Sequence, residues 1–159
     1  QENVAIIKRL KLGNVHYHHS DGRFLECDPS VGLFDAAITC PPYYDLEIYS
    51  DQPDDVSNFK TYEEFNASMW LCAQAHKPLM KPGAFVCIIV GPFRNKKTGE
   101  LIDFPAHTVE NFQDAGFVYH QQIVLSKNFG SAAQRSTNAW RGFKLCPTHE
   151  FLLVFRTPE

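Results

Sequence analysis

The chain has 159 residues, a formal charge of −3, 44% apolar residues and 21% charged residues. This length predicts one domain, residues 1–159, with enough apolar side chains for a proper core. The slightly acidic balance excludes a generally basic nucleic-acid binder and leaves room for a local basic patch. No run of residues approaches the length of a membrane span, so we expect no membrane partner.

The cysteines and histidines give no metal pattern. Five cysteines are an odd number and show no C-x-x-C spacing, which argues against a zinc site and against a disulfide framework. Reduced thiols fit a cytoplasmic protein better. The histidine-rich stretch VHYHHSD has no H-E-x-x-H pattern, so we expect solvated strand histidines and no metal.

The first part of the chain alternates between helix and strand patterns. Residues 1–14 predict an amphipathic helix that Gly13 and Asn14 end, and residues 15–25 predict a strand followed by a turn at Asp21–Gly22. The apolar run 33–40 is typical of a strand buried on both faces in a parallel sheet. Residues 51–60 are polar and irregular, which predicts a loop.

The second part continues the alternation. Thr61 and Glu64 form a capping box for a helix over 61–80, which Pro78 kinks or ends before Pro82–Gly83 turns the chain. The remaining elements are a strand over 84–90, a helix over 104–116 that stops at Gly116, and strands over 117–125 and 149–155. The order predicts an α/β fold with a mainly parallel sheet and an antiparallel pair at one edge.

The stretch TCPPYY, residues 39–44, follows the strand over 33–40, and ligands of open parallel sheets bind outside the carboxyl ends of strands. The prolines Pro41 and Pro42 remove two backbone donors, so carbonyl acceptors stand there without competing amides. Tyr43 adds a flat aromatic face at a rigid point. Acceptors beside such a face suit a planar group with an amino function, and a nucleobase is the obvious candidate.

The segment TCPPYYDLEIYS resembles the [DNS]-P-P-[YFW] motif of S-adenosylmethionine-dependent amino-methyltransferases, in particular the DNA cytosine-N4 and adenine-N6 enzymes. LMKPGAFVCIIVG and THEFLLVF resemble later strands of that family in the family's order. The resemblance implies a Rossmann-like methyltransferase fold, S-adenosylmethionine as cofactor, double-stranded DNA as partner and, as in restriction–modification systems, DNA methylation.

The resemblance also implies roles for the motif residues. The Cys40 position and the Pro41 carbonyl would accept hydrogen bonds from the target amino group, and Tyr43 would stack on a base turned out of the duplex. The family usually has Asp, Asn or Ser where this chain has Cys40, and a thiol is a weak acceptor. Ser is associated with cytosine-N4 enzymes and Cys is nearer to it in size, which favours cytosine N4 over adenine N6. Attack by a Cys40 thiolate, as in cytosine-C5 chemistry, fits the motif poorly.

The family binds its cofactor with a glycine-rich loop after its first strand, and this chain contains no G-x-G. The first two strands of the fold therefore have no counterpart in this sequence, which predicts either a longer protein with an N-terminal part or a complementary subunit. The remaining cofactor-side candidates form the segment Ser20, Asp21, Gly22 and Arg23. Asp21 would accept from the adenine amino group, and the alternative is an ordinary turn aspartate.

Basic and aromatic residues mark the long late loop. Trp140 beside Arg135, Arg141 and Lys144 predicts phosphate contacts and base stacking, against the alternative of a solvated loop with Trp140 docked on the core. For Tyr44 there are two alternatives: it belongs to this DNA-binding set, or it covers the core. The preferred hypothesis is a DNA amino-methyltransferase. The alternatives are an RNA or protein N-methyltransferase and a non-catalytic DNA-binding or regulatory module.

Overall fold

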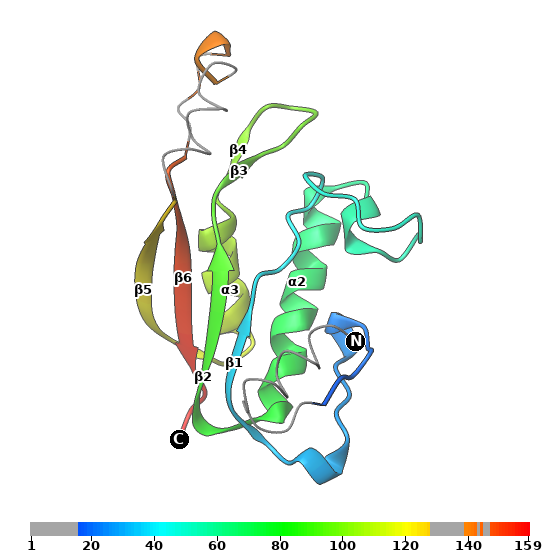
Figure 1. Cartoon of the computed structure of the whole chain (residues 1–159), viewed down its shortest axis with the longest axis vertical. Helices are drawn as coiled ribbons and strands as arrows, with labels where there is room; N and C mark the ends of the chain where they lie inside the picture. Colours follow the sequence, from blue (N-terminus) through cyan, green and yellow to red (C-terminus); the bar gives the residue numbers. More distant parts are fainter. Residues whose placement is uncertain (1–15, 128–138, 143, 145–146) are drawn as a thin grey trace, which may run out of the picture.

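The computed structural model describes residues 16–127, 139–142, 144 and 147–159. Its main sheet has the strand order β1-β2-β6-β5 (Figure 1). The strands are β1 (Phe34–Thr39), β2 (Met80–Val90), β5 (Val118–Ser126) and β6 (His149–Arg156). β1 pairs parallel with β2, whereas β6 runs antiparallel to both of its neighbours. Three of these four strands share one direction, and β6 and β5 form the predicted antiparallel pair at one edge, with the reversed strand β6 second from that edge.

Two helices, α2 (Tyr62–His76) and α3 (Phe104–Asp114), pack on one face of this sheet. Figure 1 shows α3 behind β2 and β6, with α2 beside it. Alternate residues of β2 point into the core, where Val86 and Val90 are fully buried. They meet Phe65 of α2 and Phe104 of α3, neither of which is exposed to solvent. Alternation along the strand and helical spacing along α2 therefore build one shared core.

The start of α2 and the ends of both helices carry the signals that the sequence predicts. The Thr61 side chain accepts from the Glu64 backbone N–H and the Glu64 side chain reaches back, which is the predicted capping box of α2. Pro78 lies in a short 3-10 turn, η4 (Lys77–Leu79), directly after the helix. After α3, Gly116 has φ +85° and its N–H donates to the Gln113 carbonyl. A glycine takes this left-handed conformation without the steric penalty of a Cβ, so it closes the helix.

Some expected elements differ. Residues 16–20 have no regular structure, so the predicted strand there is wrong over the described residues, and the chain enters a 3-10 turn, η1 (Gly22–Phe24). The helix expected over 1–14 lies outside the described residues. Pro82 and Gly83 do not turn the chain; they lie within β2, where the pairing with β1 shifts register and Gly83 has φ +71°.

The remaining elements are short: η2 (Pro29–Val31), η3 (Val56–Asn58), β3 (Phe93–Arg94) and β4 (Leu101–Ile102). β3 and β4 form a two-stranded hairpin above the end of β2 (Figure 1). Within the part of the chain that the structure describes, no helix is long and apolar enough to cross a membrane.

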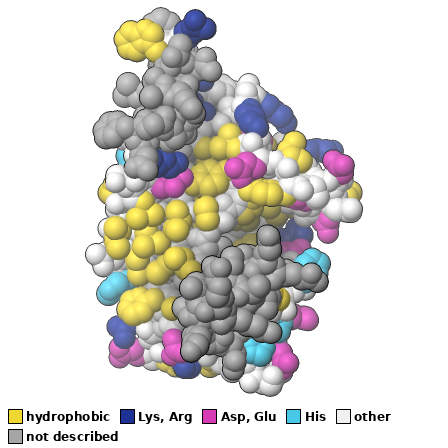
Figure 2. Space-filling view, in the orientation of Figure 1, with side chains coloured by type: hydrophobic (Ala, Val, Ile, Leu, Met, Phe, Trp, Pro, Cys, Tyr) yellow, Lys and Arg dark blue, Asp and Glu magenta, His cyan; other side chains and the backbone are white. Residues whose placement is uncertain are grey.

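The second face of the sheet is apolar and open to solvent in the described chain. Figure 2 shows hydrophobic side chains gathered on this face. Ile38 on β1 is 71% exposed, Phe85 on β2 39% and Ile123 on β5 40%. β1 also lacks a second neighbour among the described strands, so the strand expected to be buried on both faces is an edge strand here.

Candidate active site

The motif residues alternate between the protein interior and the surface at the carboxyl end of β1. Pro41 lines a small cavity of about 40 Å³ between the sheet and the two helices. Pro42 lines a separate, larger pocket on the surface. Tyr43 turns towards the end of β2, and Tyr44 turns into the core. The two prolines restrict the backbone here, so that successive side chains point in fixed and different directions.

Tyr43 is held at both ends of its ring. Its hydroxyl oxygen accepts a hydrogen bond of 2.7 Å from the Gly91 N–H, just after β2. The ring packs edge-on against Phe93 and Phe104, with centroids 5.7 and 5.6 Å away. Burial and then the charge of Glu150 raise the pKa of the Tyr43 hydroxyl, which therefore stays protonated. The structure thus gives Tyr43 a fixed position between the ends of β1 and β2.

Tyr44 lies in the core of the protein. It is only 2% exposed, and its hydroxyl donates a 3.0 Å hydrogen bond to the Lys60 carbonyl. Its backbone has φ +36°, a conformation that is uncommon for a residue with a side chain. That twist turns the ring towards Tyr62 and Phe65. Tyr44 is therefore a core residue, which is the alternative that the sequence left open, and a DNA-binding role for it stays a prediction.

Cys40 is a solvent-accessible thiol beside charged groups. Partial desolvation, then Glu150, then Glu47 raise its pKa, and Lys127 opposes them. The positive charge of Lys127 does not outweigh the other causes, and the net shift of the pKa is upward. A thiol with a raised pKa carries little thiolate at neutral pH, which makes covalent attack by Cys40 unfavourable.

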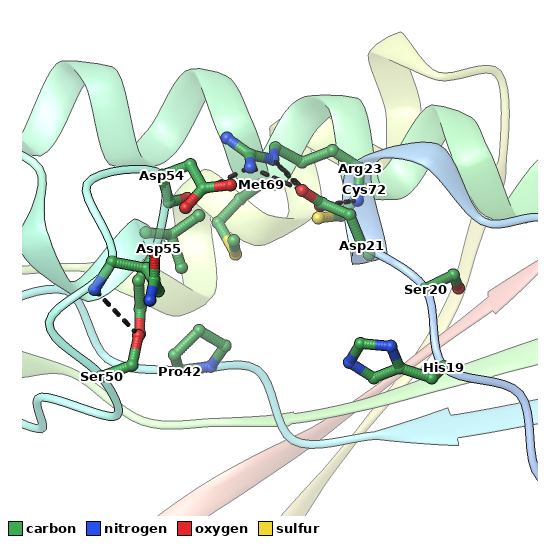
Figure 3. Close-up of a pocket in the computed structure, with 13 residues that line it drawn as sticks. His19, Ser20, Asp21, Arg23, Pro42, Ser50, Asp54, Asp55, Met69 and Cys72 are labelled. Carbon is green, nitrogen blue, oxygen red and sulfur yellow. Dashed lines mark hydrogen bonds and ion pairs between the residues drawn. The ribbon is translucent and has the colours of Figure 1, made fainter.

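A pocket of about 570 Å³ lies next to the motif (Figure 3). Ser20, Asp21, Gly22 and Arg23 form one wall, and Pro42 belongs to another. Polar residues of the loop after the motif complete the lining, among them Ser50, Asp54 and Asp55. The structure therefore brings the predicted cofactor segment and the motif to one pocket, whose volume suits a nucleoside-sized ligand.

Asp21 has a structural role at this pocket. Its carboxylate accepts from the Arg23 backbone N–H at 2.9 Å and pairs with the Arg23 guanidinium at 2.5 Å. These contacts, above all the side-chain hydrogen bond from Arg23, lower the pKa of Asp21. Arg23 also donates to the Asp54 carbonyl at 3.1 Å, which joins the two walls. Asp21 is thus a turn aspartate that also lines the pocket.

The loop opposite Asp21 is braced by its own side chains. The Asp55 carboxylate accepts from the Ser50 hydroxyl at 2.7 Å and from the Ser57 backbone N–H at 2.9 Å. Asn58 donates to the Ser50 and Gln52 carbonyls, both at 2.8 Å. These hydrogen bonds join residues of the same loop. They therefore give the polar loop predicted over 51–60 a defined conformation at the wall of the pocket.

The β3–β4 hairpin is docked on the motif loop. The Lys96 backbone N–H donates to the Asp45 carboxylate at 3.0 Å, and the Lys96 ammonium donates to the Leu46 carbonyl at 2.9 Å. The Arg94 guanidinium instead donates back to Gly99 within the hairpin, at 3.0 Å. Lys96 therefore fixes the segment that follows Tyr44.

The predicted DNA-binding residues fall partly within the described chain. Trp140 is 81% exposed, so it is not docked on the core. Arg141 and Lys144 are also exposed, whereas Arg135 lies outside the described residues. No group of three metal-type ligands occurs in the described ranges.

Sequence analysis missed Glu150 and its partner Lys127 near the end of β2. Glu150 is the second residue of β6, and its Cγ would lie 3.1 Å from a Cβ added to Gly91. Lys127, at the end of β5, pairs with the Glu150 carboxylate at 2.6 Å. The signal for Glu150 was its position near the start of the last strand, because an antiparallel strand begins where its neighbours end.

Comparison with known proteins identifies the family. Residues 34–159 match the model of the DNA methylase family of N6 and N4 type, and the chain belongs to this family. No curated protein sequence matches the chain.

Solved structures share the fold at low sequence identity. The PvuII cytosine-N4-specific DNA methyltransferase aligns with a TM-score of 0.56 and 11% identity over 80% of this chain and 44% of its own. TTHA0409 of Thermus thermophilus, a candidate DNA modification methylase solved with S-adenosyl-L-methionine, aligns at 0.54 and 21% over 79% and 48%. The N-methyltransferase NodS of Bradyrhizobium japonicum aligns at 0.52 and 12% over 96% and 66%. These likenesses confirm the Rossmann-like methyltransferase fold. The chain spans about half of the length of the DNA methylases.

Proposed function

We propose that this chain is the substrate-side part of an S-adenosylmethionine-dependent DNA methyltransferase that modifies an exocyclic amino group of a flipped base. One observation carries the proposal: in a member of the DNA methylase family, the C-P-P-Y corner stands beside a pocket of about 570 Å³ at the carboxyl end of the sheet. Substrate and cofactor can therefore meet at Pro42. Cytosine N4 is the preferred target over adenine N6, because Cys40 resembles Ser in size.

The pocket residues fit the cofactor. S-Adenosylmethionine, when bound, supplies the methyl group as an electrophilic sulfonium. Its ribose hydroxyls and amino groups are donors, and the carboxylates of Asp21 and Asp55 with the Ser50 hydroxyl offer acceptors at the pocket wall. The TTHA0409 relative, solved with S-adenosyl-L-methionine, supports the same cofactor for this chain.

On the substrate side, the chain orients the base. The Pro41 carbonyl accepts from the target amino group, with the Cys40 position beside it, so that the nitrogen lone pair faces the methyl donor. The Tyr43 ring stacks on the flipped base and favours the positive charge that develops on it. The Gly91 hydrogen bond and the two phenylalanine contacts support this role, because a fixed ring loses little freedom when the base arrives.

The partner is double-stranded DNA. Trp140 and Arg141, both exposed, offer an aromatic face and a positive charge at one end of the molecule. Lys144, also exposed, adds a second positive charge for phosphates, and the phosphate contact of Arg135 stays a prediction from the sequence.

We infer that further polypeptide completes the sheet, either an N-terminal part of the same protein or a complementary subunit. The unpaired edge of β1 among the described strands and the exposed Ile38 support this inference, since such an edge invites strand pairing. The added part would carry the glycine-rich cofactor loop.

The test is methyl transfer by the intact protein from methyl-labelled S-adenosylmethionine to DNA, RNA and protein in parallel. We expect label in DNA alone. Label in RNA or protein instead would show that RNA or protein, and not DNA, is the substrate. Binding of DNA without transfer to any acceptor, by protein that binds the cofactor, would favour the non-catalytic module.

A further inference from the structure

The proposed reaction needs a better acceptor than Cys40 provides. An exocyclic amino group carries two N–H bonds, and one of these protons must leave when the methyl group is added. A thiol is a weak acceptor. Cys40 is in addition kept protonated, because burial and nearby carboxylates raise its pKa. This inference rests on the proposed function.

Glu150 places a carboxylate at the corner. Its side chain and the Tyr43 hydroxyl both lie against Gly91: a Cβ added there would be 3.1 Å from the Glu150 Cγ and 3.7 Å from the Tyr43 hydroxyl oxygen. The strand register explains this placement, since Val90 pairs with Phe151 and the next positions are Gly91 and Glu150. A side chain at Gly91 would crowd Glu150, so the glycine helps to keep the two groups close together.

The carboxylate is both charged and accessible. Its side chain is 29% exposed, and Lys127 Nζ lies 2.6 Å from Oε1. That ion pair lies where β5 and β6 meet, on the side where Cys40 lies. A carboxylate is a stronger acceptor than a neutral thiol, with or without this partner.

Glu47, the other carboxylate close to Cys40, is engaged elsewhere. It accepts a short hydrogen bond from the Tyr49 hydroxyl, a ring that is 62% exposed on the surface. Glu47 is therefore a matched control: the same side chain, near the same thiol, on the loop that follows the motif and not at the end of β2.

We propose that the Glu150 carboxylate, and not the Cys40 thiol, binds one N–H of the target amino group and takes up the proton that methylation releases. The nitrogen lone pair forms the new N–C bond to the methyl carbon of the sulfonium donor. The S–C bond breaks and its electron pair stays on sulfur, which leaves a neutral thioether. The N–H proton passes to Glu150 and from there to solvent.

The first test is binding and requires no turnover. Two single-stranded oligonucleotide pools with identical random flanks would carry cytosine or 2-pyrimidinone, which lacks the amino group, and affinity for the intact protein would be measured with each. We expect a preference of about tenfold for cytosine, of the size of a hydrogen bond to a charged group, and its loss in Glu150→Gln. Glu47→Gln should keep the preference. An unchanged preference in Glu150→Gln would overturn the proposal.

The second test separates the carboxylate from its ion pair. Lys127→Met removes the pairing and keeps Glu150, so the preference for cytosine should persist. If Lys127→Met loses the preference as completely as Glu150→Gln, the role of Glu150 is to hold the hairpin, and the proposal is wrong. Far-UV circular dichroism checks that each variant is folded.

Methyl transfer gives the third comparison. We expect Glu150→Gln to lower the rate by about 10²-fold or more, a typical loss for a proton acceptor, and Cys40→Ala to lower it by less than about tenfold. The reverse order would return the role to Cys40. If the wild-type protein methylates nothing, the proposed function fails, while the binding preference still decides whether Glu150 recognises the amino group.

Discussion

Replacing Tyr43 by Phe removes one hydroxyl and keeps the ring. The Gly91 N–H then loses the acceptor that it contacts at 2.7 Å, whereas the packing against Phe93 and Phe104 remains. An N–H left without its partner in a part-buried place costs about 1–2 kcal/mol of stability. Tyr43→Ala also removes the ring and should cost about 3 kcal/mol or more, near the lower end for aromatic truncation.

Urea unfolding followed by tryptophan fluorescence measures both values, with the free energy extrapolated linearly to water. Tyr49→Phe is the matched control, because the hydroxyl of this exposed tyrosine donates to the surface residue Glu47, and we expect a change within about 0.5 kcal/mol. Tyr43→Phe should also retain methyl transfer within about tenfold, since the stacking face is intact. A Phe variant as stable as wild type would refute the Gly91 contact. A folded but inactive Phe variant would show that the ring is not sufficient and that the hydroxyl takes part in methyl transfer.

Three further changes follow from the structure. Thr61→Ala should lose about 1 kcal/mol in thermal unfolding through the missing helix cap, and Thr61→Ser should not; equal losses would contradict the capping box. Arg23 lowers the pKa of Asp21, so this contribution to stability is present above the ordinary pKa of 3.8 and is lost as pH falls through the lower, folded-state pKa. Acid unfolding of Asp21→Asn should accordingly depend less on pH; an identical profile would contradict the pairing. Glu150→Gln should lower the pKa of Cys40 and speed its alkylation at pH 8, seen by peptide mass mapping, and a slower reaction would contradict their proximity.

Local patterns predicted much of the fold. The capping box at Thr61, the helix stop at Gly116 and the strand over 84–90 depend on residues close in sequence, and all three are present in the structure, although one face of the strand is open to solvent. The C-P-P-Y corner was expected at the carboxyl end of a strand, and it is there. In these cases, short-range hydrogen bonds or an uninterrupted apolar run already decide the conformation.

The errors arose where tertiary neighbours decide the outcome. Residues 16–20 have a strand-like pattern, but a strand requires a partner, and these residues pair with none of the described strands. Tyr43 and Tyr44 are neighbouring tyrosines that the sequence alone does not distinguish. In the structure Tyr43 lies at the end of β2, and Tyr44, with its positive φ, points into the core. Glu150 reaches the corner through the antiparallel course of β6, a long-range pairing that no local pattern encodes.

The most direct test of the account is the identity of the methylated nucleoside. DNA incubated with the intact protein and S-adenosylmethionine would be digested to nucleosides and analysed by mass spectrometry against standards. The account predicts a base methylated on its exocyclic nitrogen, N4-methylcytosine in preference to N6-methyladenine. Cytosine methylated on carbon 5 would contradict it, since that product requires attack by a thiolate such as Cys40, and unmodified DNA from folded, cofactor-binding protein would contradict the enzymatic role itself.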